Sequence, residues 1–155
     1  MFFSIIIPLY NRPDELRELL ASLLHQTYKS FEVIIVEDGS TKPGDKVAKY
    51  FDNRLDSRYF RKENEGQGFA RNYGFAQAKG DYFIVFDSDI LVPQNYLEIV
   101  KNDINEQGWD AFGGPDAAHP SFSIIQKAIS YSMTSPFTTG GIRGNKRHVG
   151  QFHPR

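Results

Sequence analysis

The 155-residue sequence contains no cysteine, which excludes disulfide bonds and thiolate metal sites. It has no excess of basic residues either. The 18 Lys and Arg face 19 Asp and Glu, so the broad positive patch of a nucleic-acid-binding protein is not expected. No apolar run approaches the roughly 20 residues that span a bilayer. The N-terminal MFFSIII also lacks the basic start and longer apolar core of a signal peptide. We therefore expect a cytoplasmic domain.

The motifs of several common enzyme classes are also missing. There is no G-x-S-x-G nucleophile elbow and no G-x-x-x-x-G-K-[ST] phosphate-binding loop. The four histidines show no spacing of the kind that zinc sites use. These absences leave carboxylates, amides and aromatic rings as the candidate functional groups.

What the sequence does have is an alternation of apolar runs and amphipathic segments up to about residue 113. The apolar runs predict strands over 2–7, 31–36, 58–61, 81–86 and 110–114. The amphipathic segments predict helices over 11–26, 45–51, 66–80, 93–107 and 121–133. We expect Pro8 to stop the first strand, Asn11 to cap the first helix and Gly80 to close the third.

Strands that alternate with helices predict an α/β fold, with a mostly parallel sheet and helices on both of its faces. In such sheets ligands bind beyond the carboxyl ends of the strands. Three polar clusters fall at predicted strand ends, namely Pro8–Arg12, Glu37–Ser40 and Asp87–Asp89. We therefore expect the three clusters to form one site.

Two aspartates one residue apart, Asp87 and Asp89, directly follow the apolar run 81–86. In an extended stretch residues i and i+2 point the same way, so we expect the two carboxylates to converge on one cation. Carboxylate oxygens suit Mg²⁺ or Mn²⁺. The alternative is a solvated turn in which Asp89 caps the following helix.

The other two clusters and a glycine-rich helix start offer groups for a nucleotide. Asp38 can accept a hydrogen bond from a base or a ribose, or it can form an Asx turn. Tyr10 offers a ring for stacking, or it packs at the sheet edge. The glycines that open the segment 66–80 expose backbone N–H groups that attract phosphate. Arg71 lies nearly a turn further on, as a phosphate partner or as a surface ion-pair residue.

A family resemblance runs through two segments in unbroken order, SIIIPLYNRPDELRELLASLLHQTYKSFEVIIVEDGST and NEGQGFARNYGFAQAKGDYFIVFDSDILVP. Together they resemble the family 2 inverting glycosyltransferases of the GT-A fold, over residues 3–114. The resemblance implies a Rossmann-like sheet. It also implies a metal-dependent enzyme that transfers a sugar, with inversion, from a nucleotide-sugar donor, expected to be a UDP-sugar, to a saccharide or lipid-linked acceptor.

The resemblance also implies which residues bind the donor. They are Pro8, Tyr10, Asn11, Asp38, Gly66, Arg71, Asp87 and Ser88. Tyr10 and its neighbours in the P-x-Y-N motif would line the base pocket, and Asp38 would hydrogen-bond the base. Glu37 stands where the family more often has aspartate. Arg71 would lie near the nucleotide or its diphosphate. Asp89 would bind the metal, Mn²⁺ or Mg²⁺, with Asp87 beside it.

Sugar transfer needs a general base as well, which in this family is an acidic residue well downstream of the D-x-D motif. No Asp or Glu follows Asp116. The catalytic residue is therefore unknown, and we expect the base beyond Arg155. The sequence is similar to a donor-binding subdomain over 1–114, followed by the start of an acceptor-binding region over 115–155. One alternative is a non-catalytic nucleotide-sugar-binding module. Another is a nucleotidyltransferase, but its basic glycine-rich loop is missing after the first strand.

The segment 112–144 loosely resembles relatives that build cell-surface polysaccharides on lipid carriers, which implies a role in the cell envelope. The predicted helix 121–133 carries Phe122, Ile125, Ile129 and Met133 at helical spacing. It is either an interfacial helix on a membrane or a packing helix. The expected partners are a nucleotide-sugar donor and a saccharide or lipid-linked acceptor, with no nucleic acid. Peripheral association with the inner face of a membrane stays open.

Overall fold

The computed structural model describes residues 1–111, 113 and 123–134. The chain divides into two units, Met1–Gly108 and Trp109–Arg155. The strands of the first unit are β1 (Phe3–Leu9), β2 (Phe31–Asp38), β3 (Ser57–Lys62) and β4 (Tyr82–Val85). Its helices are α1 (Pro13–Leu24), α2 (Asp45–Phe51), α3 (Gln67–Gln77) and α4 (Tyr96–Gln107).

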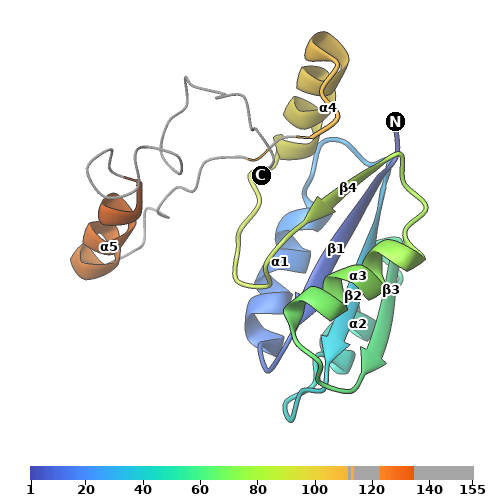
Figure 1. Cartoon of the computed structure of the whole chain (residues 1–155), viewed down its shortest axis with the longest axis vertical. Coiled ribbons are helices and arrows are strands. Elements are labelled where there is room, and N and C mark those ends of the chain that lie inside the picture. Colours follow the sequence, from blue (N-terminus) through green and yellow to red (C-terminus); the bar gives the residue numbers. More distant parts are fainter. Residues whose placement is uncertain (112, 114–122, 135–155) are drawn as a thin grey trace, which may run out of the picture. The chain divides into compact units, whose positions relative to one another are not determined.

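The four strands form one parallel sheet in the order β3-β2-β1-β4 (Figure 1). The predicted parallel α/β architecture is thus confirmed. All seven residues of β1 and all eight of β2 are buried, because both strands lie inside the sheet and helices cover their faces. This burial explains why both strands are almost continuous apolar runs.

Apolar side chains fill both faces of the sheet. On one face Ile5, Ile7 and Leu9 of β1 belong to a large cluster that includes the leucine stripe of α1. On the other face Ile6 packs with Ala70 of α3 in a smaller cluster. Helices therefore lie on both faces, as predicted, and α3 is held close to β1 and β2 (Figure 1).

The first strand does not stop at Pro8 as predicted, but continues to Leu9. The carbonyl of Ile6 accepts a hydrogen bond from the N–H of Phe86, so Ile6 faces β4. Alternate residues of a strand face the same neighbour, so Pro8 also faces that side, beyond the last residue of β4. Its missing N–H therefore leaves no gap in the sheet.

Two predicted helix boundaries were wrong as well. The N-cap of α1 is Arg12, and Asn11 makes no capping hydrogen bond. Helix α3 ends at Gln77, with Ala78 in an extended conformation. Gly80 does not close this helix. It lies in the turn before β4, where its N–H donates to Ser4 Oγ at 2.8 Å and an added Cβ would lie 2.6 Å from the Ser4 nitrogen.

The second unit contains one described helix, α5 (Ile124–Thr134). Its Ile124, Ile125, Ile129 and Tyr131 are exposed. Phe122, also predicted for this helix, lies outside the described residues. The described part of the predicted strand 110–114 is not a strand. Within the described ranges, none of the helices combines the length and apolar character that a bilayer span requires.

Candidate functional site

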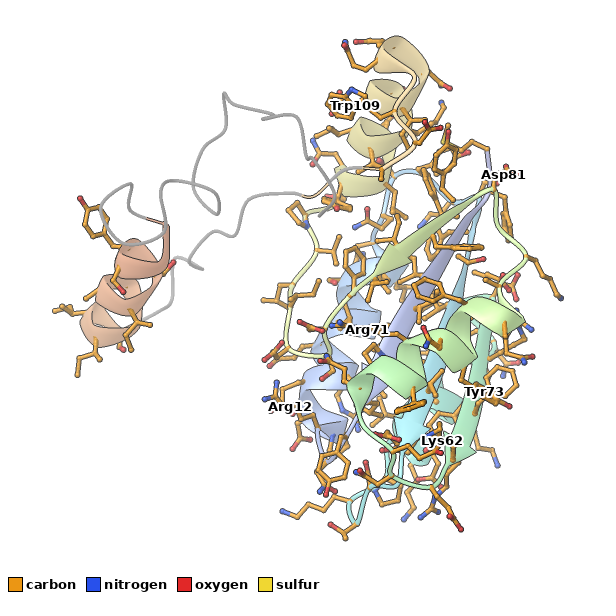
Figure 2. The ribbon with its side chains drawn as sticks, viewed as in Figure 1. Arg12, Lys62, Arg71, Tyr73, Asp81 and Trp109 are labelled. Atoms are coloured by element: carbon orange, nitrogen blue, oxygen red, sulfur yellow. The ribbon has the colours of Figure 1, made fainter. Side chains whose placement is uncertain are left out.

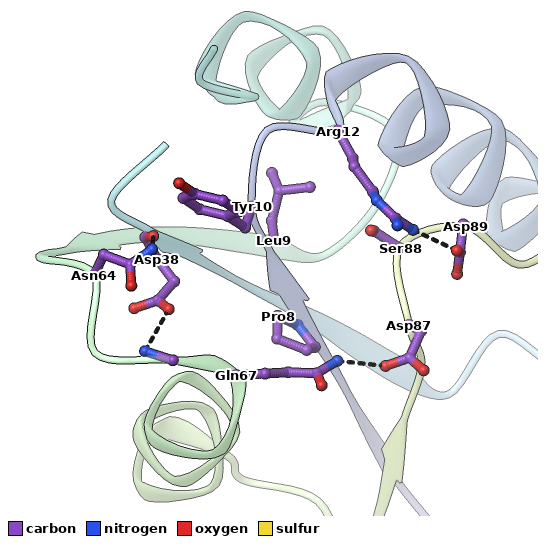
Figure 3. Close-up of a pocket in the computed structure, with 11 residues that line it drawn as sticks. Pro8, Leu9, Tyr10, Arg12, Asp38, Asn64, Gln67, Asp87, Ser88 and Asp89 are labelled. Atoms are coloured by element: carbon purple, nitrogen blue, oxygen red, sulfur yellow. Dashed lines mark hydrogen bonds and ion pairs between the residues drawn. The ribbon is translucent and has the colours of Figure 1, made fainter. Parts of the chain in front are cut away.

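Three strand ends meet at one edge of the sheet, because neighbouring parallel strands end on the same side. There they form a pocket of about 410 Å³, within the range of small-molecule sites. It is lined by Pro8, Leu9, Tyr10, Arg12, Asp38, Asn64, Gly66, Gln67, Asp87, Ser88 and Asp89. The three predicted clusters therefore each contribute to one pocket. Tyr10 and Asp38 lie on one side of it, and Asp87 and Asp89 on the other (Figure 3).

Asp38 ends β2 and is almost fully buried. Its Oδ1 accepts hydrogen bonds from Lys62 Nζ at 2.9 Å and from the Glu65 N–H at 3.0 Å, and its Oδ2 accepts one from the Gly66 N–H at 2.8 Å. Burial by itself would raise the pKa of Asp38, but these donors outweigh burial and hold the pKa below its ordinary value. Asp38 is therefore an ionised carboxylate, which can only accept hydrogen bonds.

Two glycines allow the backbone to gather around Asp38. Gly39 has a φ of +69°, and an added Cβ would lie 2.6 Å from the backbone nitrogen of Asn64. Gly66, at the N-cap of α3, has a φ of +100°. Both φ values lie in the region that favours glycine. The Asn64 side chain then donates to the Asp38 carbonyl at 3.0 Å. The backbone conformation thus explains why a glycine follows Asp38 and another follows Glu65 in the sequence.

Asn11 was predicted to bind the donor, but it does not line the pocket. Its φ is +55°, and its side-chain Oδ1 accepts hydrogen bonds from the N–H groups of Thr41 and Lys42, both at 2.8 Å. Its own N–H donates to Ser40 Oγ at 2.7 Å. Asn11 therefore ties the loop after β1 to the turn after β2, and its contact with the pocket is indirect.

Glu37, which replaces the commoner aspartate, lies in the core behind this turn. Its side chain accepts hydrogen bonds from the Ser40 hydroxyl, from the Gly44 N–H at 2.7 Å and from the Tyr59 hydroxyl at 2.8 Å. Burial and the Glu37 carboxylate raise the pKa of Tyr59 well above its ordinary value. Glu37 thus supports the turn that carries Asp38, and it takes no place in the pocket.

The two aspartates of the D-x-D motif line the same pocket but pair with different arginines. Strand β4 ends at Val85, and residues 88–89 form a turn, so the alternation of an extended chain does not apply. Asp87 Oδ1 accepts hydrogen bonds from Arg71 and Gln67, both at 2.8 Å. Asp89 pairs instead with Arg12. Asp89 does not cap the next helix either, since α4 begins at Tyr96.

Arg12, the N-cap of α1, and Arg71 of α3 therefore pair with the two aspartates on this side of the site. Figure 2 labels both arginines, and Figure 3 shows the pair of Arg12 with Asp89. Arg71, a predicted site residue, does not line the pocket itself but binds Asp87, and its buried Nε has no hydrogen-bond partner among the described residues. Four lining residues were not among the individually predicted donor-binding residues, namely Leu9, Arg12, Asn64 and Gln67, although Leu9 and Arg12 lie within the predicted cluster Pro8–Arg12. The sequence did contain a signal for Arg12, because this positively charged residue follows the first strand at the sheet edge that also carries the two aspartates.

The pair Asp87 and Asp89 fits a divalent cation in part. Their side chains are 54% and 49% exposed, and carboxylate oxygens are the ligands that Mg²⁺ and Mn²⁺ prefer. Within the described part of the chain, however, no group of three or more acidic or histidine side chains is placed to hold a metal. A cation there would need further ligands, such as phosphate oxygens.

Comparison with known proteins places this geometry in context. The family model described as Glycosyl transferase family 2 matches residues 4–150. An uncharacterized glycosyltransferase of Rickettsia bellii is 42% identical over 142 residues, which cover 92% of this chain and 19% of the relative.

Two solved structures resemble the fold. Staphylococcus aureus TarS 1-349 in complex with UDP-GlcNAc has a TM-score of 0.73 at 29% identity, over 80% of this chain and 37% of TarS. The Pyrobaculum calidifontis mannosyltransferase PcManGT, in complex with GDP-Man and Mn²⁺, has a TM-score of 0.64 at 20% identity, over 84% of this chain and 39% of PcManGT. These likenesses confirm the predicted GT-A fold. The chain spans at most 39% of each of the three proteins.

Proposed function

Because this chain belongs to glycosyl transferase family 2, we propose that it forms the donor-binding part of a sugar transferase that uses a UDP-sugar. The observation that carries the proposal is the pocket at the sheet edge. It combines an aromatic ring and an acceptor-only carboxylate on one side with two exposed aspartates on the other. The related TarS was solved with UDP-GlcNAc, which supports uridine as the nucleoside.

The base would lie beside Tyr10 and Asp38. Tyr10 is 50% exposed, so its ring has a free face on which a base can stack. Asp38 would accept a hydrogen bond from the ring N3–H of uracil. Cytosine presents an acceptor at the same position, and a carboxylate with no proton to donate cannot pair with it. This chemistry favours uracil over cytosine.

The diphosphate would lie toward the acidic side of the pocket. Asp89, with Asp87 and the adjacent Ser88, would hold a divalent cation, Mn²⁺ or Mg²⁺, and the phosphate oxygens would complete its ligand set. Such a cation stabilises the negative charge that develops on the leaving diphosphate. Arg71 would contribute a second positive charge through donors that it does not use for Asp87.

Inverting transfer also requires a carboxylate base that deprotonates the acceptor hydroxyl. Asp103 and Glu106 of α4 are exposed and do not line the pocket. We therefore place the base beyond Arg155, in a longer protein that transfers the sugar to a saccharide or lipid-linked acceptor. A non-catalytic nucleotide-sugar-binding module is the second candidate function. It is favoured because the three carboxylates that line the pocket are all assigned to the nucleobase or the cation, which leaves none of them to deprotonate the acceptor.

Thermal denaturation with and without nucleotides tests the donor assignment. UDP or UDP-GlcNAc with Mn²⁺ is expected to raise the Tm, because a ligand that binds only the folded chain stabilises it. At a ligand concentration of 100 Kd the gain is about 2.7 kcal/mol. Asp89→Ala should abolish the Mn²⁺ dependence, whereas Asp103→Ala, an exposed aspartate on α4, should not. The absence of a shift with every nucleoside diphosphate would refute the assignment.

For the location, we propose the cytoplasm, with peripheral contact at the inner face of a membrane. The exposed isoleucines of α5 support this contact. Sedimentation with anionic vesicles tests it. The chain should pellet with the vesicles, and Ile125→Asp should prevent this, whereas Ile99→Asp, an exposed isoleucine of α4, should not.

A further inference from the structure

Both carboxylates of the D-x-D motif are neutralised by arginines before any cation is present. Arg71 of α3 binds Asp87 at 2.8 Å, and Arg12, at the start of α1, binds Asp89. The two arginines come from segments nearly 60 positions apart in the sequence, so the pairing is a product of the fold. A divalent cation must therefore compete with two guanidinium groups for the same carboxylates.

The two arginines do not compete equally. Arg71 is the more buried, with 36% of its side chain exposed, and it shares Asp87 with Gln67. Arg12 and Asp89 are both about half exposed, at 48% and 49%. Arg12 also lines the pocket, whereas Arg71 does not. Arg12 therefore has both the room to change partner and a position beside the space for a ligand.

The charges make the exchange favourable only when an anion arrives. A cation that approaches Asp89 alone is opposed by the positive charge of Arg12, and it finds no third acidic or histidine ligand among the described residues. A diphosphate supplies phosphate oxygens to the cation and, at the same time, a new anionic partner for Arg12. Guanidinium groups bind phosphate as readily as carboxylate.

We propose that Arg12 is an exchangeable counter-ion that makes cation binding at Asp89 depend on the nucleotide. Without nucleotide, Arg12 holds Asp89. With nucleotide, Arg12 moves to the diphosphate and Asp89 binds the cation. Arg12 is thus a positioning residue, which couples the two ligands through a change of partner. This role rests on the proposed nucleotide-sugar function of the pocket.

The coupling is measured by titrating the 155-residue chain with Mn²⁺ and following free Mn²⁺ by electron paramagnetic resonance, with and without saturating UDP. Arg12→Gln removes the charge and keeps a polar side chain. Arg17→Gln, at an exposed arginine of α1, the helix that Arg12 precedes, is the matched control. Arg12→Lys keeps the charge. The Tm of each variant verifies that it folds.

Without UDP, Arg12→Gln should bind Mn²⁺ about two- to fivefold more tightly, the factor that the loss of an exposed ion pair represents. The factor by which UDP strengthens Mn²⁺ binding should fall by at least as much. By linkage, the same fall should appear when UDP is titrated with and without Mn²⁺. Arg17→Gln should match the unaltered chain, and Arg12→Lys should resemble it more closely than Arg12→Gln does.

An Arg12→Gln variant with unchanged or weaker Mn²⁺ affinity in the absence of UDP would overturn the proposal. An unchanged enhancement by UDP would overturn it as well. If UDP binds to none of the variants, the proposed function fails, but the comparison with Mn²⁺ alone still decides whether Arg12 competes for Asp89. The two failures are therefore distinguishable.

Discussion

Replacing Gly74 by alanine is expected to destabilise the protein, although alanine normally stabilises a helix. Gly74 lies in α3 where this helix packs on β1, and an added Cβ would be 2.5 Å from Ile6 Cγ2. Ordinary carbon contacts are about 3.5–4.0 Å, so the helix or the strand must move by about 1 Å. Overpacking of this kind costs about 1–3 kcal/mol, against a gain of up to about 1 kcal/mol in helix propensity.

Gly68 provides the matched control on the same helix. An added Cβ there meets no atom within 4 Å, so Gly68→Ala should be neutral or stabilising. The difference between the two variants then isolates the packing cost, roughly 1–3 kcal/mol. In a chain of this length 1 kcal/mol corresponds to about 2–4 °C in Tm. Urea denaturation of both variants measures the difference in free energy of unfolding.

A double-mutant cycle with Ile6→Ala sharpens the test. Ile6→Ala removes the methyl group that the new Cβ would strike, so the penalty of Gly74→Ala should shrink in that background. The movement that Gly74→Ala forces between α3 and β1 also matters for the site, because α3 carries Arg71 and Gln67 to Asp87. If Gly74→Ala proves as stable as Gly68→Ala, the close packing of α3 on β1 is refuted.

Three further changes test buried polar contacts of the sheet and of the site. Glu32 lies at the opposite end of β2 from the pocket and accepts hydrogen bonds from Ser4, Arg58 and the Lys79 N–H. For Glu32 and Asp38, burial alone would raise the pKa, but hydrogen bonds outweigh it and lower both values. Their stabilisation is complete above the unfolded values of about 4.3 and 3.9 and is lost as the pH falls through the lower folded values. The urea concentration at the unfolding midpoint should thus decrease as the pH is lowered below about 4. It should decrease less steeply with pH in a Glu32→Gln, Asp38→Asn variant, and equal pH slopes in the two proteins would contradict this. Tyr59→Phe removes the hydrogen bond to Glu37 and should cost about 1–2 kcal/mol in urea denaturation, with unchanged stability as the contrary result. Gly39→Ala forces a side chain into a φ of +69° and should lower stability by at least about 1 kcal/mol and weaken UDP binding; a variant with normal Tm and UDP affinity would contradict the turn geometry.

Much of the fold was predictable because its signals are local. The leucine spacing of α1 needs only the helical repeat, and the apolar runs of β1 and β2 need only burial on both faces. The errors fell where a distant segment decided the outcome. Pro8 stays in its strand because β4 ends before it, and Gly80 serves the approach of Ser4 instead of the end of α3.

For the candidate site, too, some features were predictable from the sequence and others were not. The chain order of Tyr10, Asp38 and the D-x-D motif indicated one pocket, because parallel strands present their carboxyl ends at one edge. The partners of these residues were not predictable from their neighbours in sequence. Asn11 turned out to hold a turn, and Glu37 lies in the core behind it.

The sequence by itself determined the alternation of strands and helices, the family and the residue types at the sheet edge, since each depends on short-range patterns. Only the tertiary structure decided what each carboxylate binds. Asp38 meets Lys62 and two backbone N–H groups, and Asp87 and Asp89 face separate arginines. Charge pairing depends on distance in space, and Arg12 and Asp89 come together only after the sheet has placed β1 beside β4.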